Sequence, residues 1–369
     1  MTVFFFYGTL CHVPLLAMVL GRDVAVHPAQ LAGHRVVWAK GGVFPVIVPD
    51  AGAVATGVLV RGMTAADVAR LDFYEVGFAF DTRDVVVNAA GPVTARVYFP
   101  HAGQWVAGAD WHLADWQAQW GATVTATAQD VMGLYGQAPA ADVLARYRLM
   151  LVRGASRVRA AAGGPVTQRF AAGAGDVTVA RRVTPYARFF AVEEYDLQFR
   201  RFDGSFSPQV NRAVFISGDA VTVLPYDPVR DVVLLIEQFR PGPFARGDTQ
   251  PWSLEAIAGR IDPGETPEQA ARREAVEEAG LVLGAMEYVG GYYPSPAGKA
   301  EYLYSYLALT DLPEGIDGVF GLAGEAEDIR GHRMPFAAFE ALMASGEVNN
   351  APLLLTGLWL QRERARLRG

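Results

Sequence analysis

The chain has 369 residues, 51% hydrophobic and 19% charged, which is typical of a soluble globular protein with two or three domains. A net charge of −7 argues against a nucleic-acid partner, and no apolar run is long enough to span a membrane. One cysteine, Cys11, excludes an intramolecular disulfide framework, and without a signal-peptide pattern we expect a cytoplasmic protein.

The N-terminal half predicts a mixture of strands and a helix. Phe4-Phe5-Phe6 indicates a buried strand that runs into the glycine turn Tyr7-Gly8-Thr9-Leu10. Further strands are expected at 54–60, 83–87 and 93–98, with a helix over ADVARLDFYE at 66–75. The turn and the LDFYE segment resemble the γ-glutamylcyclotransferase-like family, which implies a small mixed β-barrel with helices.

The resemblance implies that Tyr7 and Gly8 bind a γ-glutamyl-type substrate through backbone N–H groups and that Glu75 is the catalytic acid/base. The chain departs from the family after Glu75, because Gly77 comes one place late and the usual tyrosine is missing. The alternative is a non-catalytic binding or scaffold module in which the turn only packs.

Two segments precede the expected domain boundary. Tryptophans 105, 111, 116 and 120 have spacings that suggest one helical face, with a role in packing. Residues 139–162 are also predicted to be helical, and the glycine-rich residues 163–176 to be a linker. We therefore expect an α+β protein of two domains, 1–162 and 177–369.

The C-terminal half predicts short strands at 177–179, 189–199, 212–216, 221–224 and 232–236, and a last helix at 351–367. Asp227-Pro228 indicates a hairpin-type turn between the last two strands. This order favours an α/β/α sandwich preceded by a small antiparallel β-subdomain.

Residues 259–281 read GRIDPGETPEQAARREAVEEAGL and predict a capped helix. Thr266 and Gln269 form a capping box around Pro267, and Gly280 ends the helix. Glu274, Glu277 and Glu278 then share one face, where a divalent cation, Mg²⁺ or Mn²⁺, would relieve their repulsion. Arg273 and Glu265 are placed to orient these carboxylates, although charged helices are more often only solvated.

The spacing matches the Nudix box, and residues 178–369 resemble the ADP-ribose pyrophosphatase branch of the Nudix hydrolases. The resemblance is carried by Pro296, fifteen residues past the box, and by the segments FDGSFSPQVNRAVF, PWSLEAIAGRIDPGE, YYPSPAGKAE and GLAGEAEDIR. It implies Mg²⁺-dependent hydrolysis of ADP-ribose to AMP and ribose 5-phosphate by a homodimer. The two-domain arrangement also resembles bacterial tellurite-resistance proteins of the Nudix class.

The resemblance also assigns residues to roles. The implied metal ligands are the backbone carbonyl of Ala258 and the side chains of Glu274, Glu278 and Glu327. The implied catalytic residues are the base Glu325, together with Glu277 and Arg273 from the box. The implied substrate contacts are Arg212, Arg240, Phe189 and Glu301. Two alternatives stay open: a Nudix hydrolase for another nucleoside diphosphate sugar such as GDP-mannose, and a sensor that binds ADP-ribose without turnover.

Overall fold

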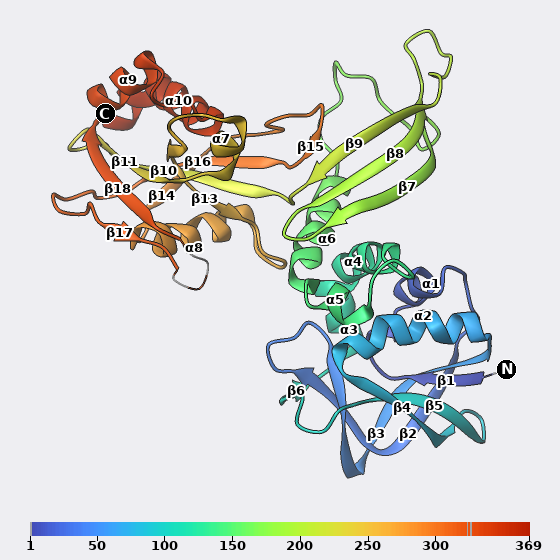
Figure 1. Cartoon of the computed structure of the whole chain (residues 1–369). Helices are drawn as coiled ribbons and strands as arrows, with labels where there is room; N and C mark the ends of the chain where they lie inside the picture. Colours follow the sequence, from blue (N-terminus) through green and yellow to red (C-terminus); the bar gives the residue numbers. More distant parts are fainter. Residues whose placement is uncertain (1, 323, 325–326) are drawn as a thin grey trace. The chain divides into compact units, whose positions relative to one another are not determined.

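The computed structural model describes residues 2–322, 324 and 327–369 (Figure 1). By contacts between residues, the chain divides into two compact units, Met1–Ala213 and Val214–Gly369. This division falls later in the chain than the linker that we expect at 163–176. Two strands and the first half of a third, over residues 177–213, lie between the two positions, and we keep 163–176 as a proposal for the domain boundary.

The first unit contains a closed barrel of five strands. The strand order is β3-β1-β5-β4-β2, and β2 pairs again with β3 to close it. A sixth strand, β6 (Ala107–Asp110), pairs antiparallel with β2. The barrel strands are β1 (Thr2–Phe6), β2 (His27–Ala39), β3 (Pro45–Met63), β4 (Phe80–Asn88) and β5 (Pro92–Pro100).

The alternation of β1 sorts its phenylalanines into two cores, because successive side chains of a strand point to opposite faces. Phe5 packs with Leu59 and Val97 of the neighbouring strands. Phe4 and Phe6 pack with the helices. Those helices are α1 (Val13–Leu20), α2 (Ala65–Glu75), α3 (Leu113–Trp116), α4 (Ala122–Gly133), α5 (Ala140–Leu144) and α6 (Tyr147–Ala161).

Two expected helices differ from the structure. The segment 139–162 is two helices, α5 and α6, separated by residues 145–146. The tryptophan segment is not one helix, because it contains β6, α3 and a π-helical turn at 117–121. The packing role is confirmed: Trp111 and Trp116 are buried in the core, and Trp105 and Trp120 pack against it.

The small antiparallel β-subdomain follows α6. It contains β7 (Val177–Ala187), β8 (Ala191–Phe199) and β9 (Val210–Ile216), and β7 pairs antiparallel with β8. Phe189, which we expected to begin a strand, lies in the turn between β7 and β8. The end of β9 reaches the second unit, where Phe215 and Ile216 pair with the short β15 (Lys299–Ala300).

The second unit is an α/β/α sandwich, as expected. Its main sheet has the order β14-β16-β10-β11-β18-β17, with β12 and β13 added on β11 and β10. The strands are β10 (Ala220–Asp227), β11 (Val232–Phe239), β12 (Trp252–Glu255), β13 (Ile257–Arg260), β14 (Ala285–Tyr292), β16 (Leu303–Leu309), β17 (Val319–Phe320) and β18 (Ile329–Pro335).

Alternating side chains of β10 and β11 give the sandwich two cores. Val223 and Leu234 pack with α8 (Pro267–Ala279) on one face of the sheet. Leu224 and Leu235 pack on the other face with α9 (Phe336–Ser345) and α10 (Ala351–Arg368), as Figure 1 shows. A short helix, α7 (Pro241–Arg246), follows β11. Among the described residues, no helix is long and apolar enough to cross a membrane.

Candidate active sites

The first candidate site lies where β13 meets α8. The predicted capping box is present, because the Thr266 side chain accepts from Gln269 N at 3.2 Å and Gln269 Oε1 accepts from Thr266 N at 2.9 Å. Pro267 is the first helical residue, and Gly280 ends the helix with a φ of 58°. Local chemistry alone therefore sets both ends of the helix that carries the glutamates.

Gly259 lets the helix lie directly on β13. A Cβ on this residue would overlap the Glu274 carboxyl group and lie 2.6 Å from Glu274 Cγ. Only glycine leaves room for that carboxyl group against the strand backbone. Gly259, the first residue of the box, thus provides the space that the Glu274 carboxyl group occupies.

Arg273 connects the carboxylates of the box. Its Nε and Nη2 donate to Glu265 at 2.9 and 3.1 Å, and its Nη1 donates to Glu274 at 2.8 Å and Glu277 at 2.9 Å. Nη2 also donates to the Arg260 carbonyl at 3.0 Å, which ties the helix to β13. The planar guanidinium therefore fixes the rotamers of three glutamates at once.

Glu278 and Glu274 are carboxyl groups held in an unfavourable environment. Glu278 is only 3% exposed and accepts from Ala258 N at 2.9 Å. Burial raises the pKa of Glu278 to about 8, against the lowering effect of the Ala258 hydrogen bond. Burial likewise raises the pKa of Glu274 to about 7, although Arg273 opposes it. Glu327 lies near enough for its charge to raise the pKa of both carboxyl groups further.

The donors at this site suit a hard divalent cation. Buried carboxyl oxygens that repel each other gain most from such a partner, and Mg²⁺ and Mn²⁺ prefer oxygen ligands. As placed, no group of three His, Cys, Asp or Glu side chains in the described part of the chain is gathered tightly enough to hold an ion. Arg273 and the Ala258 N–H each occupy one of the carboxyl oxygens instead. A cation would bind through the other oxygens of Glu274 and Glu278, which these two hydrogen bonds do not use.

Two expected substrate residues belong to the same unit and already have partners. Arg240 pairs with the buried Glu255 through Nε at 2.9 Å and Nη2 at 2.7 Å. Its charge also reaches Glu278 and Glu327, so it lies near the box. Glu301 accepts from Ser217 Oγ at 3.0 Å and pairs with Lys299 Nζ at 2.7 Å.

The other expected residues lie in the first unit or outside the described residues. Arg212 and Phe189 lie in the first unit, Arg212 exposed on β9 and Phe189 55% exposed beside Phe190. Their substrate roles stay predictions. Glu325, the expected base, lies outside the described residues. Glu327, two residues later, accepts from Leu322 N at 3.1 Å.

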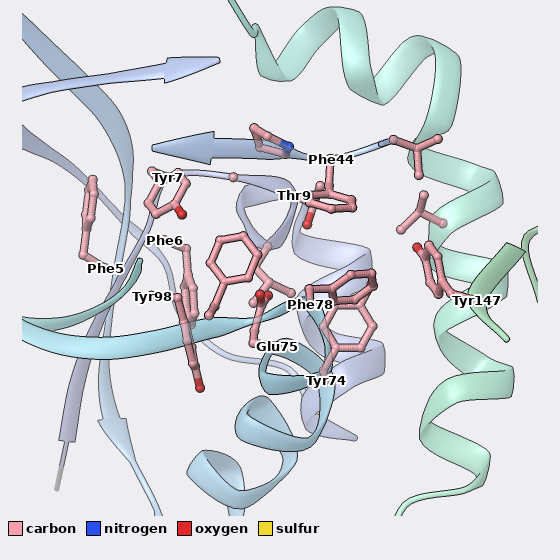
Figure 2. Close-up of a pocket in the computed structure, with 16 residues that line it drawn as sticks. Phe5, Phe6, Tyr7, Thr9, Phe44, Tyr74, Glu75, Phe78, Tyr98 and Tyr147 are labelled. Atoms are coloured by element: carbon pink, nitrogen blue, oxygen red, sulfur yellow. The ribbon is translucent and has the colours of Figure 1, made fainter. Parts of the chain in front are cut away.

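The second candidate site is a pocket of the first unit, with a volume of about 580 Å³ that includes its open mouth (Figure 2). Tyr7 and Gly8 line it at the end of β1, and Glu75 lines it at the end of α2. The structure thus brings together the three residues that the sequence singles out. None of the described lining residues is lysine, arginine or histidine.

Glu75 is the one acidic group in this aromatic lining. The rings of Phe44, Tyr74, Tyr98 and Tyr147 lie around it (Figure 2). Burial raises the pKa of Glu75 to about 8, and no hydrogen bond or ion pair to it is found in the described part of the chain. Such a carboxyl group gains and loses its proton near neutral pH, as an acid/base catalyst must.

Sequence reasoning missed three residues at these sites. Glu255 of β12 pairs with Arg240, which directly follows β11, and Tyr98 and Tyr147 enter the pocket from β5 and α6. The extended run Trp252–Glu255 beside the box offered a weak signal for Glu255. For the tyrosines there was no local signal, because their contacts are long-range.

Family models match both units. The model described as "NUDIX domain" matches residues 217–354, and that described as "Gamma-glutamyl cyclotransferase, AIG2-like" matches residues 4–118. The chain belongs to the Nudix family, with a γ-glutamylcyclotransferase-like domain before the Nudix domain.

Curated relatives sharpen the placement within the family. The ADP-ribose pyrophosphatase of Escherichia coli (strain K12) is 39% identical over 189 residues, which is 51% of this chain and 90% of the relative. That of Haemophilus influenzae is 33% identical over 52% of this chain and 89% of its own length. The GDP-mannose pyrophosphatase of Pectobacterium atrosepticum is 32% identical over 45% and 84%. The chain is therefore more similar to these ADP-ribose pyrophosphatases than to this GDP-mannose enzyme.

A solved structure titled "Crystal structure of ADP compounds hydrolase" covers 54% of this chain and 99% of its own. It is 24% identical with a TM-score of 0.41, a likeness too low to define the fold by itself.

Proposed function

We propose that the protein is a Nudix pyrophosphohydrolase that cleaves ADP-ribose to AMP and ribose 5-phosphate with Mg²⁺. The observation that carries this proposal is the buried Glu278 beside the partly buried Glu274, both lying against β13 at Ala258 and Gly259. The similarity to ADP-ribose pyrophosphatases, at 39% identity over 90% of the relative, supports the choice of substrate.

The residues of this site fall into two groups, those that would bind the cation and those that orient the cation ligands. Glu274, Glu278, Glu327 and the Ala258 carbonyl would hold the cation, and Mn²⁺ would suit the same donors. A bound cation supplies polarisation of the phosphoanhydride and a lower pKa of the attacking water. Arg273 keeps the Glu274 and Glu277 carboxylates in place through its hydrogen bonds. Glu325, two positions before Glu327 in the sequence, is our proposed base.

The substrate contacts form the next part of the proposal. Arg240, preorganised by Glu255, offers its remaining guanidinium hydrogens to phosphate oxygens. Glu301 accepts hydrogen bonds from a ribose hydroxyl, while Arg212 and Phe189 bind the phosphate and the adenine. We also propose a homodimer in the cytoplasm.

Glu278→Gln tests the proposed chemistry. The change keeps the side-chain shape but removes the charge that a cation needs, so Mg²⁺-dependent release of AMP falls at least 100-fold. Equal hydrolysis by Glu278→Gln and the parent would refute the proposal. If the protein is instead an ADP-ribose sensor, the unmutated protein would bind ADP-ribose but release no AMP.

A second function is proposed for the first unit, on the observation that Glu75 lies in the aromatic pocket beside Tyr7 and Gly8. In it, the α-amine of a γ-glutamyl amide attacks the γ-carbonyl carbon, the lactam 5-oxoproline forms, and the free amine leaves. Glu75 takes the proton from the attacking amine and returns it to the leaving amine, so atoms and charge balance.

Glu75→Gln tests this second function. The amide cannot accept a proton, so formation of 5-oxoproline falls at least 100-fold while AMP release from ADP-ribose is unchanged. A parent that forms no 5-oxoproline would instead support the non-catalytic module.

A further inference from the structure

We propose that Tyr147, on the first turn of α6, is a positioning residue of the Glu75 pocket, and that α4 and α6 supply the wall that closes it. The inference rests on the second proposed function. The proposed site thereby includes residues beyond 4–118, the part of the chain that matches the cyclotransferase family model.

The pocket is not complete within the matched residues. Two of its lining residues, Val124 and Tyr147, come from helices α4 and α6, which follow residue 118. Figure 2 shows Tyr147 entering from the helix on the side away from Tyr98 and the barrel strands. Without this helical segment, the pocket would lack part of its wall and would admit water beside Glu75.

Tyr147 is tied to the residues that surround the carboxyl group. Its hydroxyl lies close enough to that of Tyr74 to raise the pKa of Tyr74. Its ring stands edge-on to Phe78, with centroids 5.0 Å apart and planes at 87°. Both tyrosines lie close enough to Glu75 for its charge to raise their pKa values. Tyr147 therefore acts on Glu75 through Tyr74, the residue directly before it in the chain.

Gly77 lets α5, the helix that leads into α6, come close to the turn after Glu75. A Cβ at this position would overlap Leu144 of α5, with its Cγ only 2.8 Å away. The glycine is thus required for α5 to pack on the turn that follows Glu75. The two departures from the family pattern are then connected. The late glycine makes room for α5, and Tyr147 of the next helix supplies a tyrosine in place of the one that the family has shortly after the glutamate.

Buried ion pairs hold α6 in this position. Arg153 pairs with Asp130 of α4 at 2.9 Å, and both side chains are less than a tenth exposed. Arg157 pairs with the same Asp130 at 2.6 Å and with Glu193 of β8 at 3.0 Å. Breaking such a pair leaves an uncompensated buried charge, so the helix is fixed and not a loose linker.

The test measures 5-oxoproline formation from L-γ-glutamyl methylamide by the full-length parent, Tyr147→Phe and Tyr135→Phe. Tyr135 is the matched control, because it lies in the same helical region, exposed and outside the pocket lining, with its ring on Phe73. Tyr147→Phe is expected to lower kcat about tenfold while KM stays within about twofold, since the change removes the hydroxyl that acts on Tyr74, the neighbour of the base. The melting temperature and AMP release should not change.

A kcat of Tyr147→Phe equal to that of the parent would overturn the inference, as would an equal loss in Tyr135→Phe. If the parent forms no 5-oxoproline, the second proposed function fails, and calorimetry with 5-oxoproline decides the inference separately. Binding by the parent that weakens about tenfold in Tyr147→Phe alone supports the inference. Equal binding by both proteins, or none by the parent, overturns it.

Discussion

Gly259→Ala tests the packing of the box more sharply than removal of any charge. The new Cβ would overlap the Glu274 carboxyl group and lie 2.6 Å from Glu274 Cγ. Because ordinary contacts between carbon atoms begin near ~3.5 Å, the side chain must retreat by about 1 Å or more. The obstacle is a flexible side chain, so we expect the fold to survive with a melting temperature within a few degrees of the parent.

The activity should respond much more strongly than the stability. A misplacement of about 1 Å at a catalytic group costs on the order of 100-fold in rate, so kcat for ADP-ribose should fall about 100-fold. Gly290→Ala is the control, because an added Cβ there meets no atom within 4 Å. Steady-state assays with Mg²⁺ and thermal melting give both readouts. A Gly259→Ala enzyme with the parent's kcat would refute the close approach of Glu274 to β13.

The remaining predictions concern Arg273, the protonation of Glu75, and the contacts of Asp67 at the start of α2. Arg273→Lys keeps the charge but removes the planar guanidinium group that joins Glu265, Glu274 and Glu277. The Mg²⁺ concentration at half-maximal rate should therefore rise at least tenfold, and an unchanged Mg²⁺ titration would contradict this role. In the first unit, kcat/KM for 5-oxoproline formation should rise with pH through about 8, as Glu75 loses its proton and becomes a base; a profile that is flat from pH 6 to 9 speaks against Glu75. Asp67→Ala removes the acceptor of Thr64 and Arg22 and should cost about 2 kcal/mol in urea unfolding at pH 7. The Arg22 hydrogen bond holds the pKa of Asp67 below its usual range, so this stability is present above about pH 4 and is lost as the pH falls; an equal loss on mutation at pH 3 and pH 7 would refute it.

Local signals account for what the sequence predicts well. Both ends of α8 follow from Thr266, Gln269 and Gly280, each of which acts on the backbone within a few residues. The grouping of Tyr7 with Glu75 came from a family resemblance, and the pocket confirms that they lie together.

Long-range contacts account for what the sequence does not reveal. The tryptophans at 105–120 suggested one helix, yet Trp105 donates to Phe78 O and Trp116 to Val43 O from different elements. Several short elements that converge on one core can imitate a helical spacing. Tyr147 is 72 positions from Glu75, and no spacing rule connects them.

Product analysis with purified full-length protein and Mg²⁺ tests the central claim most directly. ADP-ribose and GDP-mannose are supplied in separate reactions, and AMP and GMP are quantified over a range of substrate concentrations. We expect AMP and ribose 5-phosphate with a kcat/KM at least tenfold above that for GMP release. A higher kcat/KM for GMP release, or binding of ADP-ribose without Mg²⁺-dependent AMP release, would contradict the proposed function.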